Sequence, residues 1–310
     1  MTRKFGRQYR VTIYPFDGGD PIIVELPFTI KFSMTRSINS STNPLVLEIY
    51  NLNEESRNRI FQDWNDIAPA EDANGDPILN NEGRVRAFHN IIIEMGYDTL
   101  YKVYDGRMTY AGSTREGTNI ITQIQAMDGM LSIAGTQTYR TLAEGSTARD
   151  LINSLIEDYN ETGMKAGAVG SAEQIFTRPV ALSGNTWELL KQNTDSKVYV
   201  DNGFVFVLKD DEVLTNVQII DAASGLLETP RRAEAILEIT TLLEPAVGVG
   251  EQIDLRNTIQ KEYDGVYKVI SITHSGGISA AVSEQTITRF GLQAPDKFKG
   301  FTVVERESGA

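Results

Sequence analysis

The chain has 310 residues, enough for two or three packed domains, with 42 acidic against 29 basic side chains and a formal net charge of −13. A surface of this sign repels phosphate backbones and anionic membranes, which argues against a nucleic-acid-binding protein. The chain has no cysteine, which excludes disulfides and thiolate metal sites. It has only two histidines, His89 and His274, so zinc sites and histidine-based catalysis are poorly supplied. The longest apolar run is too short to span a membrane and no signal peptide follows Met1, so we expect a soluble chain that is not exported.

The first fifty residues alternate between apolar and polar side chains. Tyr9, Val11 and Ile13 are separated by polar residues, and residues 17–20 (DGGD) supply turn chemistry before a second alternating run at 22–26. Residues 28–35 and 45–49 alternate in the same way. The pattern predicts four antiparallel strands that form a barrel or a sandwich.

A helix and a long loop interrupt this pattern. Asn53 can cap a short helix, because Glu54 and Glu55 follow it and favour the positive end of a helix. Residues 63–86 are rich in Asn, Asp, Gly and Pro and form too long a connection for a compact domain, so we expect a projecting loop. Strands are predicted to resume at 88 and to continue to about 128.

The middle of the chain mixes helices with strands. Ser146 or Thr147 can cap a helix with one apolar stripe, and Asn185 can cap a second helix that carries Trp187. Residues 198–208 predict a hairpin whose Asn-Gly turn favours positive φ angles. Further strands are expected from 217 to 290.

Two stretches, 88–106 and 247–274, share the order strand, polar connection and second strand near a Tyr-Asp-Gly, which suggests a weak duplication. We therefore predict a first β-barrel domain at 1–140, an α+β domain at 141–210, a second β-barrel domain at 211–295 and a flexible C-terminal tail at 296–310.

Five phrases in this order resemble the baseplate hub proteins of contractile-tailed bacteriophages, which are related to the hub part of type VI secretion spike trimers. The phrases are residues 47–55 (LEIYNLNEE), 147–152 (TARDLI), 185–190 (NTWELL), 197–203 (KVYVDNG) and 265–269 (GVYKV). Each phrase alone encodes only a strand, a cap or a turn. The resemblance lies in their order and spacing and spans most of the chain.

The resemblance implies a mainly β fold, in which two tail-tube-like antiparallel β-barrel domains flank a small helix-and-hairpin domain. It implies a non-enzymatic structural hub without cofactors, a homotrimeric ring that joins the hexameric tail tube to the trimeric spike and leaves a channel for DNA. Its implied partners are further copies of itself, a tail tube or tube-adaptor protein, a separate spike protein, baseplate wedge proteins and the tape measure protein. The implied location is the virion tail baseplate, with assembly in the bacterial host cytoplasm.

A hub of this kind works through interfaces, so we expect contacts from the loop 63–86, the tail 297–310 and the strand edges 9–14 and 267–273. The candidate interface residues are Tyr9, Val11, Ile13, Trp64, Asp72, Asp76, Tyr267, Val269, Phe298 and Phe301. Two interpretations of the acidic charge stay open. An acidic lumen would repel passing DNA, or acidity only keeps the protein soluble.

Other chemistry finds weaker support. Residues 72–76 (DANGD) begin like a calcium loop, but Pro77 stands where that loop requires glycine. The acid pairs at 157–158 and 210–211 are adjacent residues, whereas a glycosidase needs two carboxylates facing each other across a cleft. Residues 247–250 (VGVG) lack the ending of a phosphate loop and predict a turn. The alternative functions are a carbohydrate- or cell-wall-binding accessory module, which Trp64 or Trp187 could serve, and a glycosidase.

Overall fold

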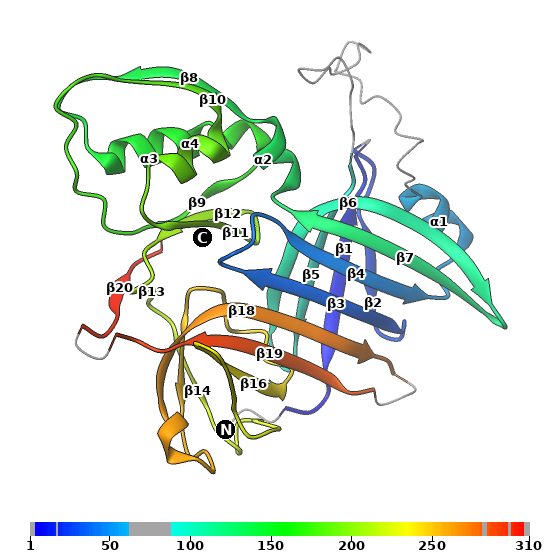
Figure 1. The fold of residues 1–310 in the computed structure, drawn as a ribbon. Coiled ribbons are helices and arrows are strands. Elements are labelled where there is room, and N and C mark those ends of the chain that lie inside the picture. Colours follow the sequence, from blue (N-terminus) through cyan, green and yellow to red (C-terminus); the bar gives the residue numbers. More distant parts are fainter. Residues whose placement is uncertain (1–3, 17, 62–87, 281–283, 297–298, 307–310) are drawn as a thin grey trace, which may run out of the picture.

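The computed structural model describes residues 4–16, 18–61, 88–280, 284–296 and 299–306, and most of them lie in antiparallel strands (Figure 1). The first strands are β1 (Gln8–Tyr14), β2 (Ile22–Glu25), β3 (Ile30–Ser37), β4 (Asn43–Tyr50), β5 (Asn90–Gly96), β6 (Leu100–Glu116) and β7 (Asn119–Asp128). One short helix, α1 (Glu54–Ile60), follows β4, and the Asn53 side chain caps it by accepting from the Ser56 N–H. The predicted hairpin, the alternating strands and this cap are confirmed. The expected loop at 63–86 lies outside the described residues.

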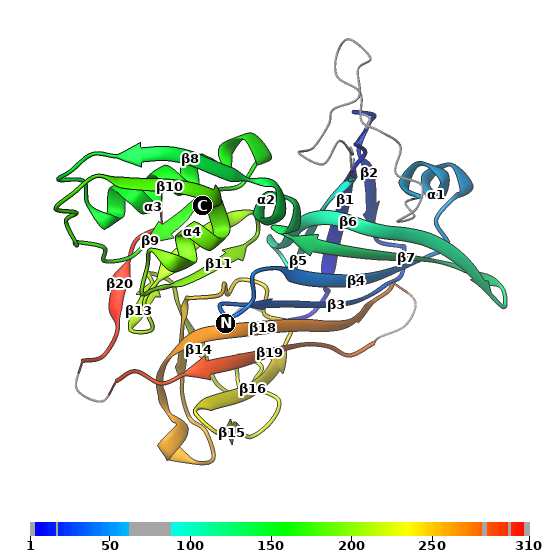
Figure 2. The same ribbon diagram turned by 45° about the horizontal axis from the view of Figure 1, so that its top comes forward.

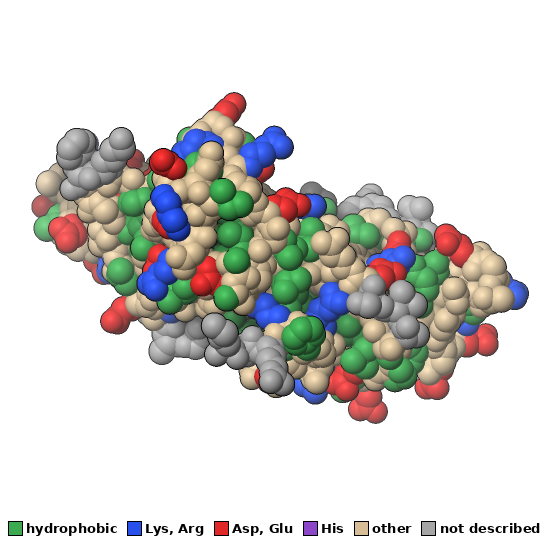
Figure 3. All heavy atoms as spheres, turned by 90° about the horizontal axis from the view of Figure 1, so that it is seen from below, with side chains coloured by type: hydrophobic (Ala, Val, Ile, Leu, Met, Phe, Trp, Pro, Cys, Tyr) green, Lys and Arg blue, Asp and Glu red, His purple; other side chains and the backbone are tan. Residues whose placement is uncertain are grey.

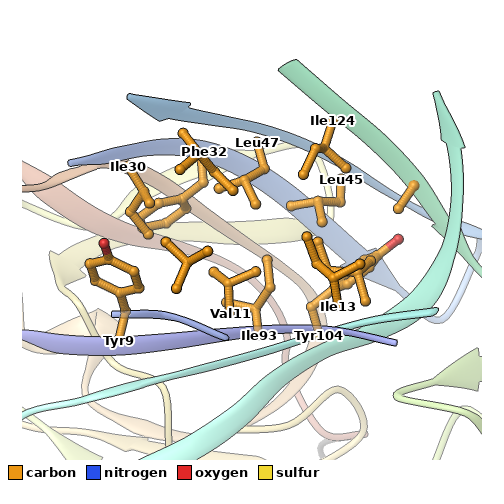
Figure 4. Packing of buried hydrophobic residues seen from close by; sticks show 14 of the residues in the cluster. Tyr9, Val11, Ile13, Ile30, Phe32, Leu45, Leu47, Ile93, Tyr104 and Ile124 are labelled. Atoms are coloured by element: carbon orange, nitrogen blue, oxygen red, sulfur yellow. The ribbon is translucent and has the colours of Figure 1, made fainter. Parts of the chain in front are cut away.

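The strands of the first part enclose an apolar core. β1, β2, β5 and the first half of β6 lie on one side, and β3, β4, β7 and the second half of β6 lie on the other. Figure 4 shows side chains from both sides meeting, with Val11 and Ile93 pointing toward Leu47 and Phe32. The alternation of the sequence exists because one face of each strand packs into this core.

The last part of the chain builds a second set of strands. They are β13 (Glu212–Leu214), β14 (Val217–Ile220), β15 (Arg231–Ala233), β16 (Ile236–Leu242), β17 (Gln252–Leu255), β18 (Gly265–Ile278), β19 (Thr286–Gln293) and β20 (Thr302–Val304). Gly250, with a φ of 83°, turns the chain into β17. The sequence 247–250 is therefore a turn before a strand, as predicted.

One pairing joins the two β parts. β3 pairs antiparallel with β18 over eight residue pairs, so the strand order runs β15-β16-β19-β18-β3-β4-β7-β6-β5-β1-β2 in a single sheet. β18, β3, β4 and β7 run side by side in both ribbon views (Figures 1 and 2). No pairing between described strands closes this sheet into a barrel. The mainly antiparallel β fold with an α+β part is confirmed.

Helices and short strands form the α+β part. Its helices are α2 (Met130–Gly135), α3 (Ala148–Glu157), the 3-10 turn η1 (Asn160–Thr162) and α4 (Thr186–Gln192), and its strands are β8 (Gln137–Leu142), β9 (Lys165–Val169), β10 (Val180–Asn185), β11 (Lys197–Asp201) and β12 (Phe204–Leu208). A second 3-10 turn, η2 (Lys261–Tyr263), precedes β18. Thr147 and Asp150 form a capping box on α3, and Asn202 and Gly203 turn the β11–β12 hairpin with φ of 54° and 82°. These local predictions are confirmed.

Three separate apolar clusters fill the molecule. The first lies among β1–β7, the second among β14–β19 and the third around α3 and α4. Ile38 belongs to the second cluster, Leu243 and Ile278 to the first, and Ile133 packs on the third. Because these residues cross the limits at 140 and 210, the predicted domain division stays a prediction.

The C-terminal segment differs from the expected flexible tail. β20 pairs in parallel with β13 (Figure 2). The Arg306 guanidinium lies 2.7 Å from the Glu251 carboxylate. The prediction was wrong for residues 302–306, because a parallel pairing with a distant strand leaves no local sequence pattern. None of the described helices is long and apolar enough to cross a membrane.

Candidate functional site

The polar groups that suggested chemistry have structural partners. His274 is fully buried within β18, 2.9 Å from the Thr288 hydroxyl, and burial holds its pKa well below the usual range. Asp158 accepts hydrogen bonds from Thr138 and Arg140. Trp187 is buried in the third cluster, so it packs on the helices and is not available to stack on a sugar. Among the described residues no cluster of His, Asp and Glu could hold a metal ion.

A buried polar junction ties the three clusters together. The Arg36 guanidinium from β3 lies 3.1 Å from the Asp201 carboxylate at the end of β11 and donates to the Val247 carbonyl. Asn43 donates to the Val200 carbonyl at 2.7 Å. This junction fixes β11 against the sheet, because the attraction between buried charges offsets their cost of desolvation only when the pair keeps a good geometry.

Asp128 lies beside this junction. Its carboxylate accepts from the Gly203 N–H at 3.2 Å, while burial and the nearby carboxylates of Asp201 and Asp105 raise its pKa to about 8. This shift favours the protonated form of Asp128 in the folded protein, which limits the negative charge that is buried at the junction.

The sheet presents an open face on the side opposite its core. Residues of this face are mostly uncharged. They include polar side chains, such as Ser33 and Thr35 in β3 and Gln125 in β7, and exposed apolar ones, such as Val46 in β4 and Met127 in β7. The hydroxyls of Thr35 and Thr273 lie 3.1 Å apart across the β3–β18 pair. Its charged residues nearly balance, with three basic and four acidic side chains. They are Lys31, Arg231 and Arg289, and Glu48, Glu116, Glu238 and Glu284, of which Glu284 lies 3.4 Å from Lys31.

Two edges of this open sheet have no partner strand among the described residues. The second half of β6, from Thr109 to Glu116, pairs only with β7. At the other end, β15 pairs only with β16, and the preceding Leu226 forms a bridge to Thr241. Unpaired N–H and C=O groups at such edges can accept a strand from another chain.

The candidate interface residues of the two predicted edges lie elsewhere. Tyr9, Val11 and Ile13 are buried in the first cluster, and β1 pairs with β2 on one side and β5 on the other. Tyr267 and Val269 are buried in the second cluster, and β18 has partners along both edges. The prediction that these strands are free edges was wrong, because their partners come from distant parts of the chain.

Of the remaining candidate interface residues, the structure describes only Phe301. Phe301 is half-buried next to β20. Trp64, Asp72, Asp76 and Phe298 lie outside the described residues. Sequence analysis missed the edges of β6 and β15, since an edge strand is defined by the strand order and not by its own residues.

Apolar side chains are also exposed on the strands of the second β part. Val217 and Ile219 on β14 and Val266 on β18 are 47%, 44% and 39% exposed. Figure 3, which views the molecule from below, shows hydrophobic side chains interspersed with basic and acidic ones. Ile219 and Val266 lie in one row on either side of Asp254, so the three apolar side chains form a small group on one face of β14, β17 and β18. Exposed apolar groups of this size are normal for a protein surface.

Comparison with known proteins assigns the family. A family model described as baseplate hub gp41 matches residues 9–275. The chain belongs to this baseplate hub family. Its members are structural proteins of the phage tail, as the resemblance of the sequence implied. Among curated proteins, none matches the chain.

Solved structures agree on the fold. The 43 kDa tail protein of prophage MuSo2 from Shewanella oneidensis has a TM-score of 0.57 at 10% identity, over 93% of this chain and 96% of that one. A tail protein from Neisseria meningitidis MC58 has a TM-score of 0.56 at 9% identity, over 93% and 97%. The Escherichia coli c3393 protein, a type VI secretion component similar to T4 tail proteins gp27 and gp5, has a TM-score of 0.52 at 9% identity, over 91% and 77%.

Proposed function

We propose that this baseplate hub protein forms a homotrimeric ring that joins the hexameric tail tube to the trimeric spike and leaves a channel for DNA. The observation that carries the proposal is that one chain contains two similar β units side by side. β6 and β18 are both long strands that bend at a bulge, after Met108 and after Val269. Three such chains would present six similar units, which suits a six-fold tube.

The open face of the sheet is the surface we assign to the channel. Its uncharged side chains offer few charges to a passing phosphate backbone, and its three basic residues are nearly balanced by four acidic ones. DNA would therefore pass without specific binding. This assignment replaces the acidic lumen, and leaves the excess of acidic residues on other surfaces, where it favours solubility.

The proposed partners follow from the two sides of such a ring. One side would contact the tail tube or a tube-adaptor protein and the tape measure protein, and the other a separate spike protein. Wedge proteins of the baseplate would surround the ring, in a virion assembled in the host cytoplasm. The work of the chain is structural and lies in these contacts.

Electron microscopy of the purified chain tests the ring. Images averaged along the symmetry axis should show a central opening surrounded by six similar densities from three chains. A compact particle without an opening, or a ring built from another number of chains, would contradict the proposal. Adding the separate spike protein to the same preparation gives a second view, because the spike should occupy one face of the ring.

A further inference from the structure

We infer that a pocket beside the buried polar junction binds a carboxamide group, the side chain of a glutamine or asparagine from another polypeptide. The pocket has a volume of about 210 Å³. It is lined by residues of β3, β6, the β11–β12 hairpin, the turn before β17 and the C-terminal segment, so all three parts of the chain contribute to it. The inference goes beyond the proposed ring and does not depend on it.

Arg36 leaves one of its N–H donors unused in the wall of this pocket. Its Nη1 lies 3.1 Å from the Asp201 carboxylate, and its Nη2 donates to the Val247 carbonyl at 3.2 Å. Asp201 and Val247 also line the pocket, so the guanidinium forms part of its wall. The side chain is 2% exposed, and its Nε–H has no hydrogen-bond partner among the described residues. A buried donor without a partner destabilises the folded state, so a ligand that presents an acceptor here would bind favourably.

Asn202 leaves an acceptor unused on the same pocket. It lies in the β11–β12 turn, where its Nδ2 donates to the Lys102 carbonyl at 3.4 Å and its own carbonyl accepts from Lys102 Nζ at 3.3 Å. Its Oδ1 is buried and accepts no hydrogen bond from the part of the chain that the structure describes. The pocket therefore offers one free donor and one free acceptor. This pair is the complement of an amide, which carries a carbonyl oxygen and an N–H group.

The charges of the pocket favour a neutral ligand. Each basic side chain that lines it has a carboxylate within 3.2 Å. The pairs are Arg36–Asp201, Lys102–Asp105 and Arg306–Glu251. An anionic ligand would lie beside the carboxylates of Asp201 and Glu251, which line the pocket and would repel it. A carboxamide offers the same acceptor oxygen as a carboxylate without this repulsion.

The size and the walls of the pocket suit a single side chain. Pockets for drug-sized ligands measure about 300 to 1,000 Å³, so this one is too small for such a ligand. Tyr101, Phe204 and Pro245 supply apolar surface that can contact the methylene groups of a glutamine or asparagine. Tyr101 is 44% exposed, which leaves the pocket open to a neighbouring chain. Because a structural protein of the phage tail is surrounded by other polypeptides, we assign the carboxamide to a protein side chain.

Three small probes of similar shape test the chemistry. Propionamide carries a carbonyl and an NH₂ group, butanone has a methyl group in place of the NH₂, and propionate has a charged oxygen there. Saturation-transfer NMR with the purified chain gives their dissociation constants in any oligomeric state, because it observes the ligand. We expect propionamide to bind about fivefold more tightly than butanone, as one added hydrogen bond allows, and propionate to bind no more tightly than butanone.

Asn202→Gly locates the binding in this pocket. Glycine adopts the φ of 54° found at Asn202 without strain, so the hairpin is retained while the acceptor is removed. The variant should bind propionamide as weakly as it binds butanone. The matched control is Asn257→Gly, which replaces another asparagine with a φ of 54° outside the lining of the pocket and should bind like the wild type. Arg36 is kept in every variant, because its loss would leave Asp201 buried without a partner.

A competition experiment tests the source of the carboxamide. N-acetyl-glutamine methylamide and N-acetyl-norleucine methylamide share a backbone and differ in the end of the side chain. The glutamine compound should displace propionamide from the wild type, whereas the norleucine compound should not.

The outcomes separate the chemistry from its source. Tighter binding of propionate than of propionamide, or equal binding of propionamide by the wild type and Asn202→Gly, overturns the carboxamide site. No binding of any probe would show that the pocket holds water only and overturns it as well. Binding of propionamide that the glutamine compound does not displace overturns the protein side chain and supports a free small amide instead.

Discussion

Arg36 and Asp201 lie buried against each other where the three apolar clusters meet, with side chains only 2% and 5% exposed. A buried charge without its partner destabilises a fold strongly, since water cannot solvate it. Asp201→Asn should therefore lower the free energy of unfolding by about 3 to 5 kcal/mol, measured by urea unfolding. The control is Glu188→Gln, which breaks the exposed pair with Lys191 and should leave stability unchanged within error. Equal effects of the two changes would contradict the role of the junction.

Asp128 should make stability depend on pH. Its pKa rises from 3.8 to about 8 on folding, so the folded state binds the proton more tightly, and stability falls as pH increases from about 4 to about 8. Asp128→Asn keeps an oxygen for the Gly203 N–H and removes the titration. We expect the wild-type unfolding free energy to fall by up to about 1 kcal/mol per pH unit relative to this variant.

The measurement compares urea midpoints of the two proteins at pH 5, 6, 7 and 8. Asp201 and Asp105 are the carboxylates that face Asp128, and Arg36 reaches it only through Asp201. Burial and the nearby Arg36 guanidinium lower the pKa of His274 well below its usual range, and the variant leaves these surroundings in place, so its contribution is common to both proteins. Parallel pH curves for wild type and variant would show that Asp128 does not titrate in this window.

At the scale of elements, β20 holds the C-terminal segment against the second β part. Arg306 donates to Glu251, which also accepts from the Gly248 N–H and from Asn216. Arg306→Gln should speed hydrogen exchange of the β20 amides several-fold without changing the global unfolding midpoint, because the guanidinium is partly exposed and the pair is weak. Lys299→Gln, an exposed change in the same segment, is the control. Unchanged exchange in Arg306→Gln would mean that the strand pairing alone holds the segment.

Elements with local causes could be predicted from the sequence, and elements with distant causes could not. Asn53 and Thr147 cap helices through residues three positions away, and Asn202 with Gly203 fixes a hairpin by its own φ angles. The pairings of β1 with β5, β3 with β18 and β13 with β20 join segments far apart in the chain. The free edges of β6 and β15 follow from those pairings. Local sequence patterns therefore could not predict these edges, which form the candidate interface.

The predicted duplication was also only approximately located by the sequence. The sequence placed the repeat at two Tyr-Asp-Gly phrases, whereas the pairings align the strands by their bulges at Thr109 and Ile270. Tyr104 therefore matches Gly265 rather than Tyr263. The phrases are near the equivalent positions but differ from them by two residues, because strand register is set by packing on the core face and not by identity of residues.

At the scale of the whole molecule, the eight strands from β15 to β6 form an open part of the sheet, with an edge at each end that no described strand covers and a face with few charges. Such a sheet leaves backbone groups unpaired at both ends, which favours association with further copies. Because the edges differ from each other, we propose that copies associate head to tail, which forms a closed ring when the rotation between copies closes, rather than a two-fold dimer.

The absolute mass of the purified chain, measured by light scattering after size exclusion over a concentration series, tests the central claim most directly. One chain has a mass of 34.3 kDa, so three chains give about 103 kDa. The proposed ring predicts this species, with its share increasing with concentration. A mass of one chain at every concentration, or a stable species of two chains, would contradict the account.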